Sequence, residues 1–257
     1  MTSLHLPMSW MLQDLEDGPA PLWAQIADRL RADIKLGAFR PGDLLPGESE
    51  LNRRFGVSRT TSRAALDCLE TEGLIVRKSG RGSMVLAPRI ERPLNRLSSF
   101  SEDMQARGLR AGYRTRSIRR CPAEALVATE LQIAPGTDVI EIHRLLLADG
   151  SPIATSMTYL ASFAFEGGPF PDTAALDGGS LYQWLEDKSG VRLAAGSERI
   201  EAMIADPATA QSLGLRSPAA VLVSRRTSRT HEGRPVEFAV LHYRGDRYNF
   251  RVESVRP

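Results

Sequence analysis

The sequence is poor in cysteine and has no long apolar run. It contains two cysteines in 257 residues, Cys68 and Cys121, and neither belongs to a Cys-x-x-Cys pair or lies near a group of histidines. This argues against a disulfide scaffold or a zinc site and fits a reducing compartment. No apolar stretch approaches the roughly 18 residues that a membrane-spanning helix needs. We therefore expect a cytoplasmic protein that binds no metal, cofactor or membrane.

The sequence also has no large excess of either positive or negative charge. The formal net charge is only +2, which excludes a polycation that binds nucleic acid through bulk charge. A hydrophobic fraction of 42% and a charged fraction of 25% are ordinary for a globular protein, and the length suits one large or two modest domains. Residues 1–19 have no basic leader, so we expect an N-terminal extension and not a signal peptide.

The sequence after this extension contains the start and stop signals of three helices followed by a hairpin. An apolar residue recurs at every fourth position from Leu22 to Ile34, which predicts an amphipathic helix. A second short helix follows, and a third begins after Ser58, a typical N-cap residue. The stretch LIVRKSGRGSMVL then predicts two short strands around a glycine turn. This order over residues 20–87 is that of a winged helix-turn-helix.

Positive charge gathers at one end of this region. Arginines and short hydroxyls occupy the first turns of the third predicted helix, which is the end that enters the major groove in helix-turn-helix proteins. Arginine can pair with a guanine edge or a phosphate, and the basic hairpin tip could follow the adjacent backbone. The plainer interpretation is a capped surface helix with solvated arginines. The predicted DNA-binding residues are Glu48, Arg53, Ser58, Arg59, Thr60, Thr61, Arg63, Arg77, Lys78, Gly80, Arg81 and Gly82.

The second half of the chain predicts an antiparallel sheet. Residues 88–96 hold two prolines and several charges, a composition typical of a linker. Beyond them, VIEIHRLLLADGSPIATSMTYL predicts two strands joined at Asp149-Gly150, and a second long hairpin turns at Glu232-Gly233. Helical segments lie between these strands. We therefore expect residues 97–253 to form an α+β domain with a central antiparallel sheet.

This half offers no convincing catalytic set. Its histidines are scattered, and no nucleophile elbow, zinc-protease motif or phosphate-binding loop is present, so we expect no enzyme activity. Arg144 stands out because it shares an otherwise apolar strand face with Ile142 and Leu146. A buried arginine needs a partner. That partner is either a carboxylate such as Glu237 or a ligand.

The helix and hairpin region resembles a known family of DNA-binding domains. The segment PLWAQIADRLRADIKLGAFRPGDLLPGESELNRRFGVSRTTSRAALDCLETEGLIVRKSGRGSMV is similar to the GntR-type winged helix over its whole length. It departs from the family pattern at Gly47, where serine is usual, and at Ser62, where an apolar or β-branched residue is usual. The resemblance implies a transcriptional regulator that binds an inverted repeat in double-stranded operator DNA as a homodimer.

Residues 92–253 resemble the UTRA domain of the HutC-type branch of that family. The resemblance rests on SSFSEDMQARG, RLLLADGSPIA, GSLYQWLEDKSGVRL and GRPVEFAVLHYRGDRYNF. It implies a chorismate-lyase-like fold that senses a small molecule and pairs two chains. In members that bind phosphorylated amino sugars, the ligand is held at positions that match Ser98, Ser99, Arg144, Ser180, Tyr182, Glu237 and Tyr243.

Two positions of that site differ in this chain. Leu146 stands in place of a second arginine, and Ser156, which we also assign to the site, stands in place of a glutamate. The effector that we expect is therefore a small anionic metabolite other than a standard phosphorylated amino sugar.

Three functions are compatible with the sequence. The first is a ligand-responsive regulator, a repressor that its metabolite releases from the operator. The second is a DNA-binding regulator whose C-terminal domain only dimerises. The third is a chorismate-lyase-like enzyme fused to a DNA-binding module, and the lack of an acid, base or nucleophile set argues against it.

Overall fold

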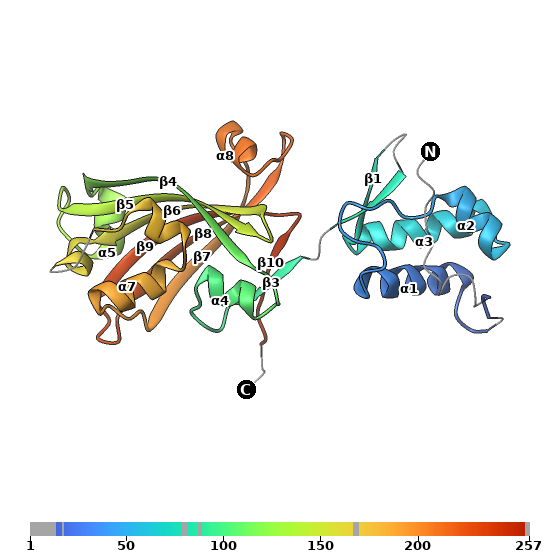
Figure 1. Cartoon of the computed structure of the whole chain (residues 1–257), viewed down its shortest axis with the longest axis horizontal. Coiled ribbons are helices and arrows are strands. Elements are labelled where there is room, and N and C mark those ends of the chain that lie inside the picture. Colours follow the sequence, from blue (N-terminus) through green and yellow to red (C-terminus); the bar gives the residue numbers. More distant parts are fainter. Residues whose placement is uncertain (1–13, 17, 79–81, 87–88, 167–169, 255–257) are drawn as a thin grey trace. The chain divides into compact units, whose positions relative to one another are not determined.

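The chain folds into two compact units that meet in sequence between Pro88 and Arg89 (Figure 1). The structure is a computed structural model, and it describes residues 14–16, 18–78, 82–86, 89–166 and 170–254. Each unit has its own apolar core. The winged helix-turn-helix followed by an α+β domain with an antiparallel sheet is as predicted from the sequence.

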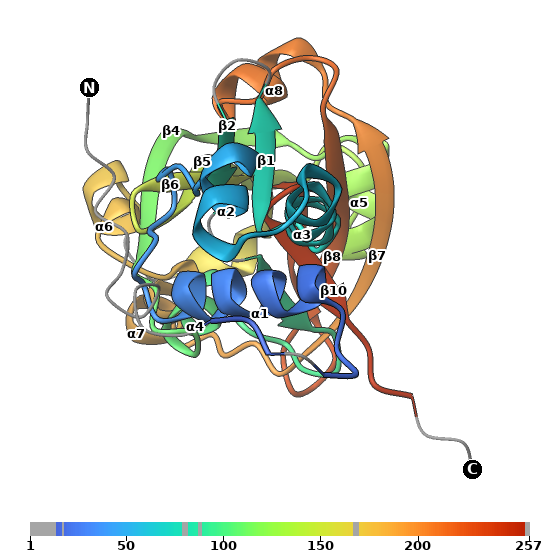
Figure 2. The ribbon, with the colours of Figure 1, turned by 90° about the vertical axis from the view of Figure 1, so that its right-hand side faces the viewer.

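The first unit contains three helices and a two-stranded hairpin. These elements are α1 (Leu22–Lys35), α2 (Glu48–Phe55), α3 (Arg59–Thr71), β1 (Ile75–Lys78) and β2 (Gly82–Val85). The helix α1 packs against α3, and β1 lies beside α3 (Figure 2). The stretch before α2 extends the hairpin, because the N–H of Leu45 donates to the carbonyl of Ser83 at 2.8 Å.

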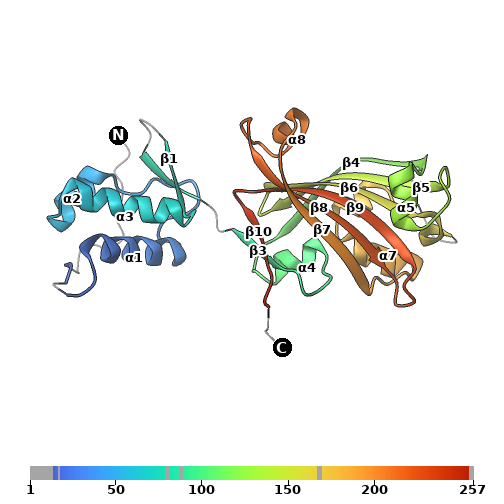
Figure 3. The ribbon, with the colours of Figure 1, turned by 180° about the vertical axis from the view of Figure 1, so that it is seen from behind.

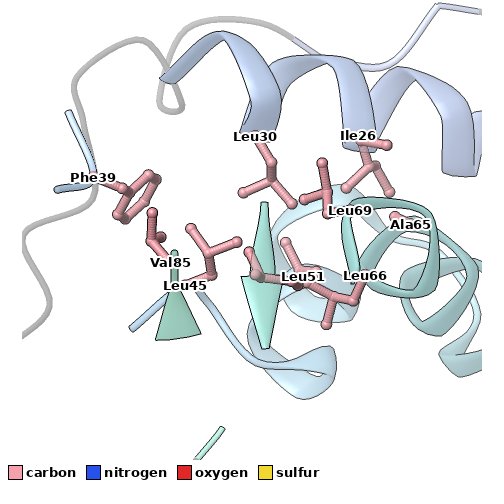
Figure 4. Close-up of a cluster of buried hydrophobic side chains, with 11 residues drawn as sticks. Ile26, Leu30, Phe39, Leu45, Leu51, Ala65, Leu66, Leu69 and Val85 are labelled. Atoms are coloured by element: carbon pink, nitrogen blue, oxygen red, sulfur yellow. The ribbon is translucent and has the colours of Figure 1, made fainter. Parts of the chain in front are cut away.

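The core of this unit forms where apolar stripes of the three helices converge. Ile26, Leu30, Leu51 and Leu69 are all fully buried, and Figure 4 shows their side chains directed toward one another. The helix spacing predicted these positions, since residues three or four apart share one helix face. Burial of each such side chain stabilises the fold by about 1.5–3 kcal/mol.

The ends of α2 and α3 are fixed by local hydrogen bonds. The Ser58 hydroxyl accepts the N–H of Thr61 at 3.2 Å, which confirms the predicted N-cap of α3. Gly56 ends α2 with a φ of 64°, a conformation that glycine adopts without strain. At the other end of α2, Glu50 accepts the N–H of Gly47 at 2.8 Å. This bond supplies a cap contact although Gly47 has no side chain of its own.

Ser62, the second departure from the family pattern, has a structural partner. Its side chain is fully buried on α3, and its hydroxyl donates to the Asn52 side-chain oxygen of α2 at 2.5 Å. The bond therefore holds the two helices of the helix-turn-helix in register.

Replacing Ser62 by alanine is expected to lower the free energy of unfolding of this unit by about 1 kcal/mol, because the substitution leaves the Asn52 oxygen without its partner. Thermal unfolding of the full chain would measure the effect. The exposed Thr60→Ala on the same helix serves as control and should leave the transition unchanged. Equal transitions for both variants would contradict a role for the Ser62–Asn52 bond.

The second unit is built on a six-stranded antiparallel sheet. The strand order is β4-β5-β6-β9-β8-β7. The strands are β4 (Ala111–Pro122), β5 (Asp138–Ala148), β6 (Ser151–Ala161), β7 (Ala195–Ile204), β8 (Ala220–Arg229) and β9 (Pro235–Arg244). The predicted hairpin turn at Asp149-Gly150 joins β5 to β6, and both residues have positive φ.

Helices cover both faces of this sheet. They are α4 (Phe100–Gln105), α5 (Ala125–Leu131), the 3₁₀ helix η2 (Ser162–Phe165), α6 (Thr173–Asp177), α7 (Leu181–Ser189) and α8 (Pro207–Ser212). Because strand residues alternate between faces, Ile140 and Ile142 of β5 pack with α7, whereas Leu145 and Leu147 pack with α8. This double coverage explains why β5 is buried almost throughout.

The stretch predicted to be a linker contains a strand. Within residues 88–96, β3 (Ile90–Pro93) pairs in parallel with β10 (Tyr248–Arg251). Some of the charged residues that indicated a solvated linker are buried. Arg92 is 1% exposed, and its side chain forms ion pairs with Asp103 at 3.2 Å and with Glu198 at 2.7 Å. Composition alone does not show that a buried partner neutralises a charge.

Candidate DNA interface and effector pocket

The N-terminal turns of α3 present the residues expected to meet DNA. Arg59, Thr60 and Arg63 are exposed, while the Thr61 hydroxyl lies 2.8 Å from the hydroxyl of Ser58. The backbone N–H groups at a helix start attract anions, and the exposed guanidinium groups extend that attraction. This end of α3 can therefore hold phosphates and reach base edges.

One carboxylate organises the basic side chains around this helix end. Glu48 lies 3.0 Å from Nε of Arg63, 3.8 Å from Nε of Arg59 and 3.9 Å from a terminal nitrogen of Arg77. The hydrogen bond from Arg63 lowers the pKa of Glu48, so the carboxylate stays ionised at neutral pH. Glu48 thus gathers arginines from α3 and β1 on one face of the unit.

The remaining members of the predicted set differ in their exposure and contacts. Arg53 is exposed on α2. Arg77 is mostly covered and also pairs with Asp67 at 3.0 Å, which makes it less available than Arg59 or Arg63. The backbone of Lys78 pairs with that of Gly82 in the hairpin. Gly80 and Arg81 lie outside the described residues.

A hollow lies over the sheet of the second unit where α4 and α7 begin. Its inner chamber has a volume of about 30 Å³, and a wider outer pocket of about 780 Å³ shares Ser99, Tyr113, Ser180 and Tyr182 with it. Six residues predicted from the sequence line the inner chamber: Ser99, Arg144, Ser156, Ser180, Tyr182 and Glu237. The structure therefore brings together residues from β5, β6, β9 and the starts of two helices.

Arg144 is the central cation of the inner chamber. It lies on β5 opposite Ser156 of β6, and only 7% of its surface is exposed. Its guanidinium stacks on the Tyr113 ring at 4.9 Å from the ring centre. Within the described part of the chain, its Nε and one terminal nitrogen are buried without a hydrogen-bond partner. Burial lowers the pKa of Arg144, as expected for a cation without a neutralising partner.

A second arginine, missed in the sequence, lines the same chamber. Arg226 of β8 is 7% exposed and lies 3.8 Å from the Glu237 carboxylate, and its Nε also lacks a hydrogen-bond partner among the described residues. It occupies a different strand from Leu146, where the family site has its second arginine. The available signal was the alternation of Ser224, Arg226 and Ser228, which places three polar residues on one face of the strand.

The Glu237 carboxylate forms its hydrogen bonds with residues other than Arg144. It accepts hydrogen bonds from the Tyr182 hydroxyl at 2.9 Å and from the Ser228 hydroxyl at 2.7 Å. Burial raises the pKa of Tyr182 far above neutral pH, so the phenol keeps the proton that it donates. With two guanidinium groups and one carboxylate, the inner chamber carries an excess positive charge.

Two predicted residues lie outside the lining of the chamber. The Ser98 hydroxyl donates to Asp103 of α4 at 2.7 Å, and its carbonyl accepts a bond from Arg226 at 3.4 Å. Tyr243 stacks on Tyr248, with 4.1 Å between the ring centres. Neither side chain belongs to the chamber lining, whereas Ser99 lines it and caps α4.

The described residues provide no other obvious chemistry. They contain no group of three or more histidine, cysteine or acidic side chains that could hold a metal. None of the helices among them combines the length and apolar character needed to cross a membrane. The arrangement suits the binding of an anion by buried donors, because guanidinium and hydroxyl groups all donate hydrogen bonds.

Comparisons with known proteins identify both units. Residues 22–85 match the model of bacterial regulatory proteins of the gntR family, and residues 106–249 match the UTRA domain. The chain is 32% identical to the HTH-type transcriptional repressor NagR of Bacillus subtilis, over 91% of this chain and 95% of that protein. It is 30% identical to the probable transcriptional regulator PhnF of Escherichia coli, over 90% and 94%.

A solved structure gives the same result. The crystal structure of PhnF from Mycobacterium smegmatis matches with a TM-score of 0.66 and 27% identity, over 90% of this chain and all of that one. The chain therefore belongs to the gntR family of bacterial regulatory proteins and is a DNA-binding transcriptional regulator with a UTRA ligand-binding domain.

Proposed function

We propose that the protein is a homodimeric repressor that leaves its operator when a small anionic metabolite binds the inner chamber. The observation that carries this proposal is the pair of buried arginines, Arg144 and Arg226, with guanidinium nitrogens that lack partners among the described residues. A buried donor without an acceptor costs about 1–3 kcal/mol, and more when it is charged. An anionic group with several oxygens would remove that cost. The name of NagR as a repressor supports the assignment of this chain as a repressor.

The alternative of a domain that only dimerises accounts less well for the chamber. A domain without a ligand gains nothing from two buried cations of which only Arg226 has a carboxylate partner, because apolar side chains of similar size would be at least as stable. Arg226 also supplies the chamber with a second cation, although Leu146 stands where the family site has its second arginine. We therefore favour a sensing domain.

The size of the chamber suggests how binding reaches the DNA-binding unit. A volume of about 30 Å³ holds only one or two water molecules, so an anionic group can enter only if the lining moves. Ser99 belongs to that lining and caps α4, and Asp103 of α4 holds Arg92 on β3, the first strand after Pro88. A ligand that prefers the opened chamber would shift the position of α4 and of this strand.

On the DNA side, we propose that α3 enters the major groove with Arg59 and Arg63 foremost. Two copies would place two such helices on an inverted repeat, with the half-site spacing set by the dimer. The whole predicted set, Lys78, Gly80 and Arg81 of the wing included, remains the candidate contact surface.

Operator binding is expected to weaken steeply with salt, because phosphate contacts release condensed counterions. A duplex selected from a random library by the full-length protein provides the operator, and fluorescence anisotropy measures its affinity. If about six to ten phosphates are contacted, the affinity should fall roughly 10³- to 10⁵-fold between 50 and 200 mM salt. No enrichment of a duplex, or an affinity insensitive to salt, would overturn the DNA-binding part of the proposal.

A further inference from the structure

Glu48 places a negative charge on the surface that is expected to meet DNA. It is the first residue of α2, which packs against α3 (Figure 3). Ion pairs join it to Arg59 and Arg63 of α3 and to Arg77 of β1. A carboxylate at this place repels phosphates, so it weakens binding to DNA of every sequence. It can still improve discrimination between sequences, because specificity is a difference of affinities.

The contact between Glu48 and Arg63 leaves one edge of the guanidinium group available. Nε of Arg63 donates to Oε1 of Glu48 at 3.0 Å, and one terminal nitrogen donates to Oε2 at 3.4 Å. Among the described residues, no hydrogen bond occupies the other terminal nitrogen, and the side chain is exposed. Arginine pairs with O6 and N7 of guanine through two parallel N–H groups. The far edge of Arg63 offers such a pair.

Arg63 is the arginine that Glu48 holds most firmly. Arg59 lies 3.8 Å from the carboxylate, with 72% of its side chain exposed. Arg77 lies 3.9 Å from it and pairs more closely with Asp67, at 3.0 Å. Both distances to Glu48 are longer than an ordinary N–H···O hydrogen bond. Arg59 can therefore turn toward a phosphate freely, whereas Arg63 must first break two hydrogen bonds with Glu48.

We infer that Glu48 is a positioning residue that makes Arg63 read a guanine in the major groove instead of binding a phosphate. On a duplex with guanine at the matching position, Arg63 keeps both bonds to Glu48 and forms a forked pair with the base. On other sequences, Arg63 reaches a phosphate only after it leaves Glu48, and the carboxylate then faces the DNA without a partner. This inference rests on the proposed entry of α3 into the major groove and assigns the source of its specificity.

Removing the charge of Glu48 tests the inference in the full-length protein. Glu48→Gln should raise the affinity for a random duplex and lower the ratio of operator affinity to random-duplex affinity by about tenfold, since a bidentate pair with a base discriminates by about that factor or more. Anisotropy at one fixed salt concentration measures both affinities, with the operator that the wild type selects.

Glu50→Gln is the matched control for the loss of charge. It removes the same charge from the same helix, and glutamine can keep the hydrogen bond to the N–H of Gly47. It should leave the ratio of the two affinities unchanged. An equal fall of the ratio in Glu48→Gln and Glu50→Gln would overturn the inference, because net charge alone would then explain the effect.

Selection of duplexes from a random library shows whether Glu48 acts through Arg63. Glu48→Gln and Arg63→Ala should relax the same base position in each half-site. In a chain that already carries Arg63→Ala, Glu48→Gln should change nothing further at that position. Relaxation of a different position would overturn the inference, because Glu48 would then contact a base itself.

A shorter side chain separates the position of the carboxylate from its charge. Glu48→Asp keeps the charge but withdraws it from Arg63, so the ratio should fall without a rise in random-duplex affinity. An unchanged ratio in both Glu48→Gln and Glu48→Asp would overturn the inference and leave the proposed function standing. A wild-type protein that selects no duplex would overturn both.

Discussion

Replacing Arg63 by alanine is expected to weaken operator binding by roughly 30-fold or more. Each lost guanidinium contact with a base or phosphate costs about 1–3 kcal/mol, and the proposed dimer would lose two of them. Arg63 is the strongest candidate because it lies in the first turns of α3, is 57% exposed and is held by Glu48 at 3.0 Å. That ion pair fixes the guanidinium near the helix end where DNA is expected.

Anisotropy with the selected duplex would measure the loss, and two variants make it specific. Lys35→Ala removes an exposed charge from the end of α1 and should leave the affinity unchanged. Arg77→Ala should cost less than Arg63→Ala, because Arg77 is largely occupied by Asp67 and Glu70. An Arg63→Ala protein that folds normally and binds the operator as well as wild type would contradict the proposed recognition helix.

The DNA-binding unit could be predicted almost entirely from the sequence because its signals are local. Ser58 caps the helix that it was expected to cap, and Gly56 adopts the left-handed conformation that ends α2. The role of Glu48 was less visible. Its contacts with Arg59, Arg63 and Arg77 span up to 29 positions in sequence, and only the packing of α2, α3 and β1 brings them together.

The effector chamber was harder to predict because its parts come from separate strands. Arg144 was conspicuous, since a charge between apolar neighbours at two-residue spacing must be buried. Arg226 was not, because it follows Arg225 in a stretch rich in polar residues, where a surface position is the ordinary interpretation. The hairpin of β8 and β9 was predicted, but the pairing of β9 with β6 brings it to Arg144 and Ser156, and no local pattern encodes that strand order.

The strand β3 likewise depends on a long-range pairing that no local sequence pattern shows. Its four residues were assigned to a linker from their prolines and charges, but the parallel pairing with β10 joins positions more than 150 residues apart. Arg92 can be buried because its ion pairs with Asp103 and Glu198 neutralise its charge. Long-range pairing therefore decides whether a charged segment is a linker or part of a core.

Replacing Arg144 by methionine is expected to abolish effector binding without loss of stability. The effector is first identified by a thermal-shift screen of phosphorylated sugars, amino acids and phosphonates on the full-length protein. Calorimetry with the resulting compound should then show at least a 100-fold loss of affinity for Arg144→Met, because hydrogen bonds to a charged group are among the strongest in proteins. Arg226→Met should also weaken binding, whereas operator binding without effector should persist in Arg144→Met.

The stability of the same variants separates a ligand-binding arginine from a structural one. Arg144 has no carboxylate partner of its own among the described residues, so an apolar side chain of similar volume should leave the melting temperature unchanged or raise it. Arg92→Met is the matched control, because it strands Asp103 and Glu198 in the interior and should cost about 3–5 kcal/mol. If Arg144→Met instead destabilises the protein as much as Arg92→Met does, Arg144 supports the fold, and the chamber loses its central ligand-binding cation.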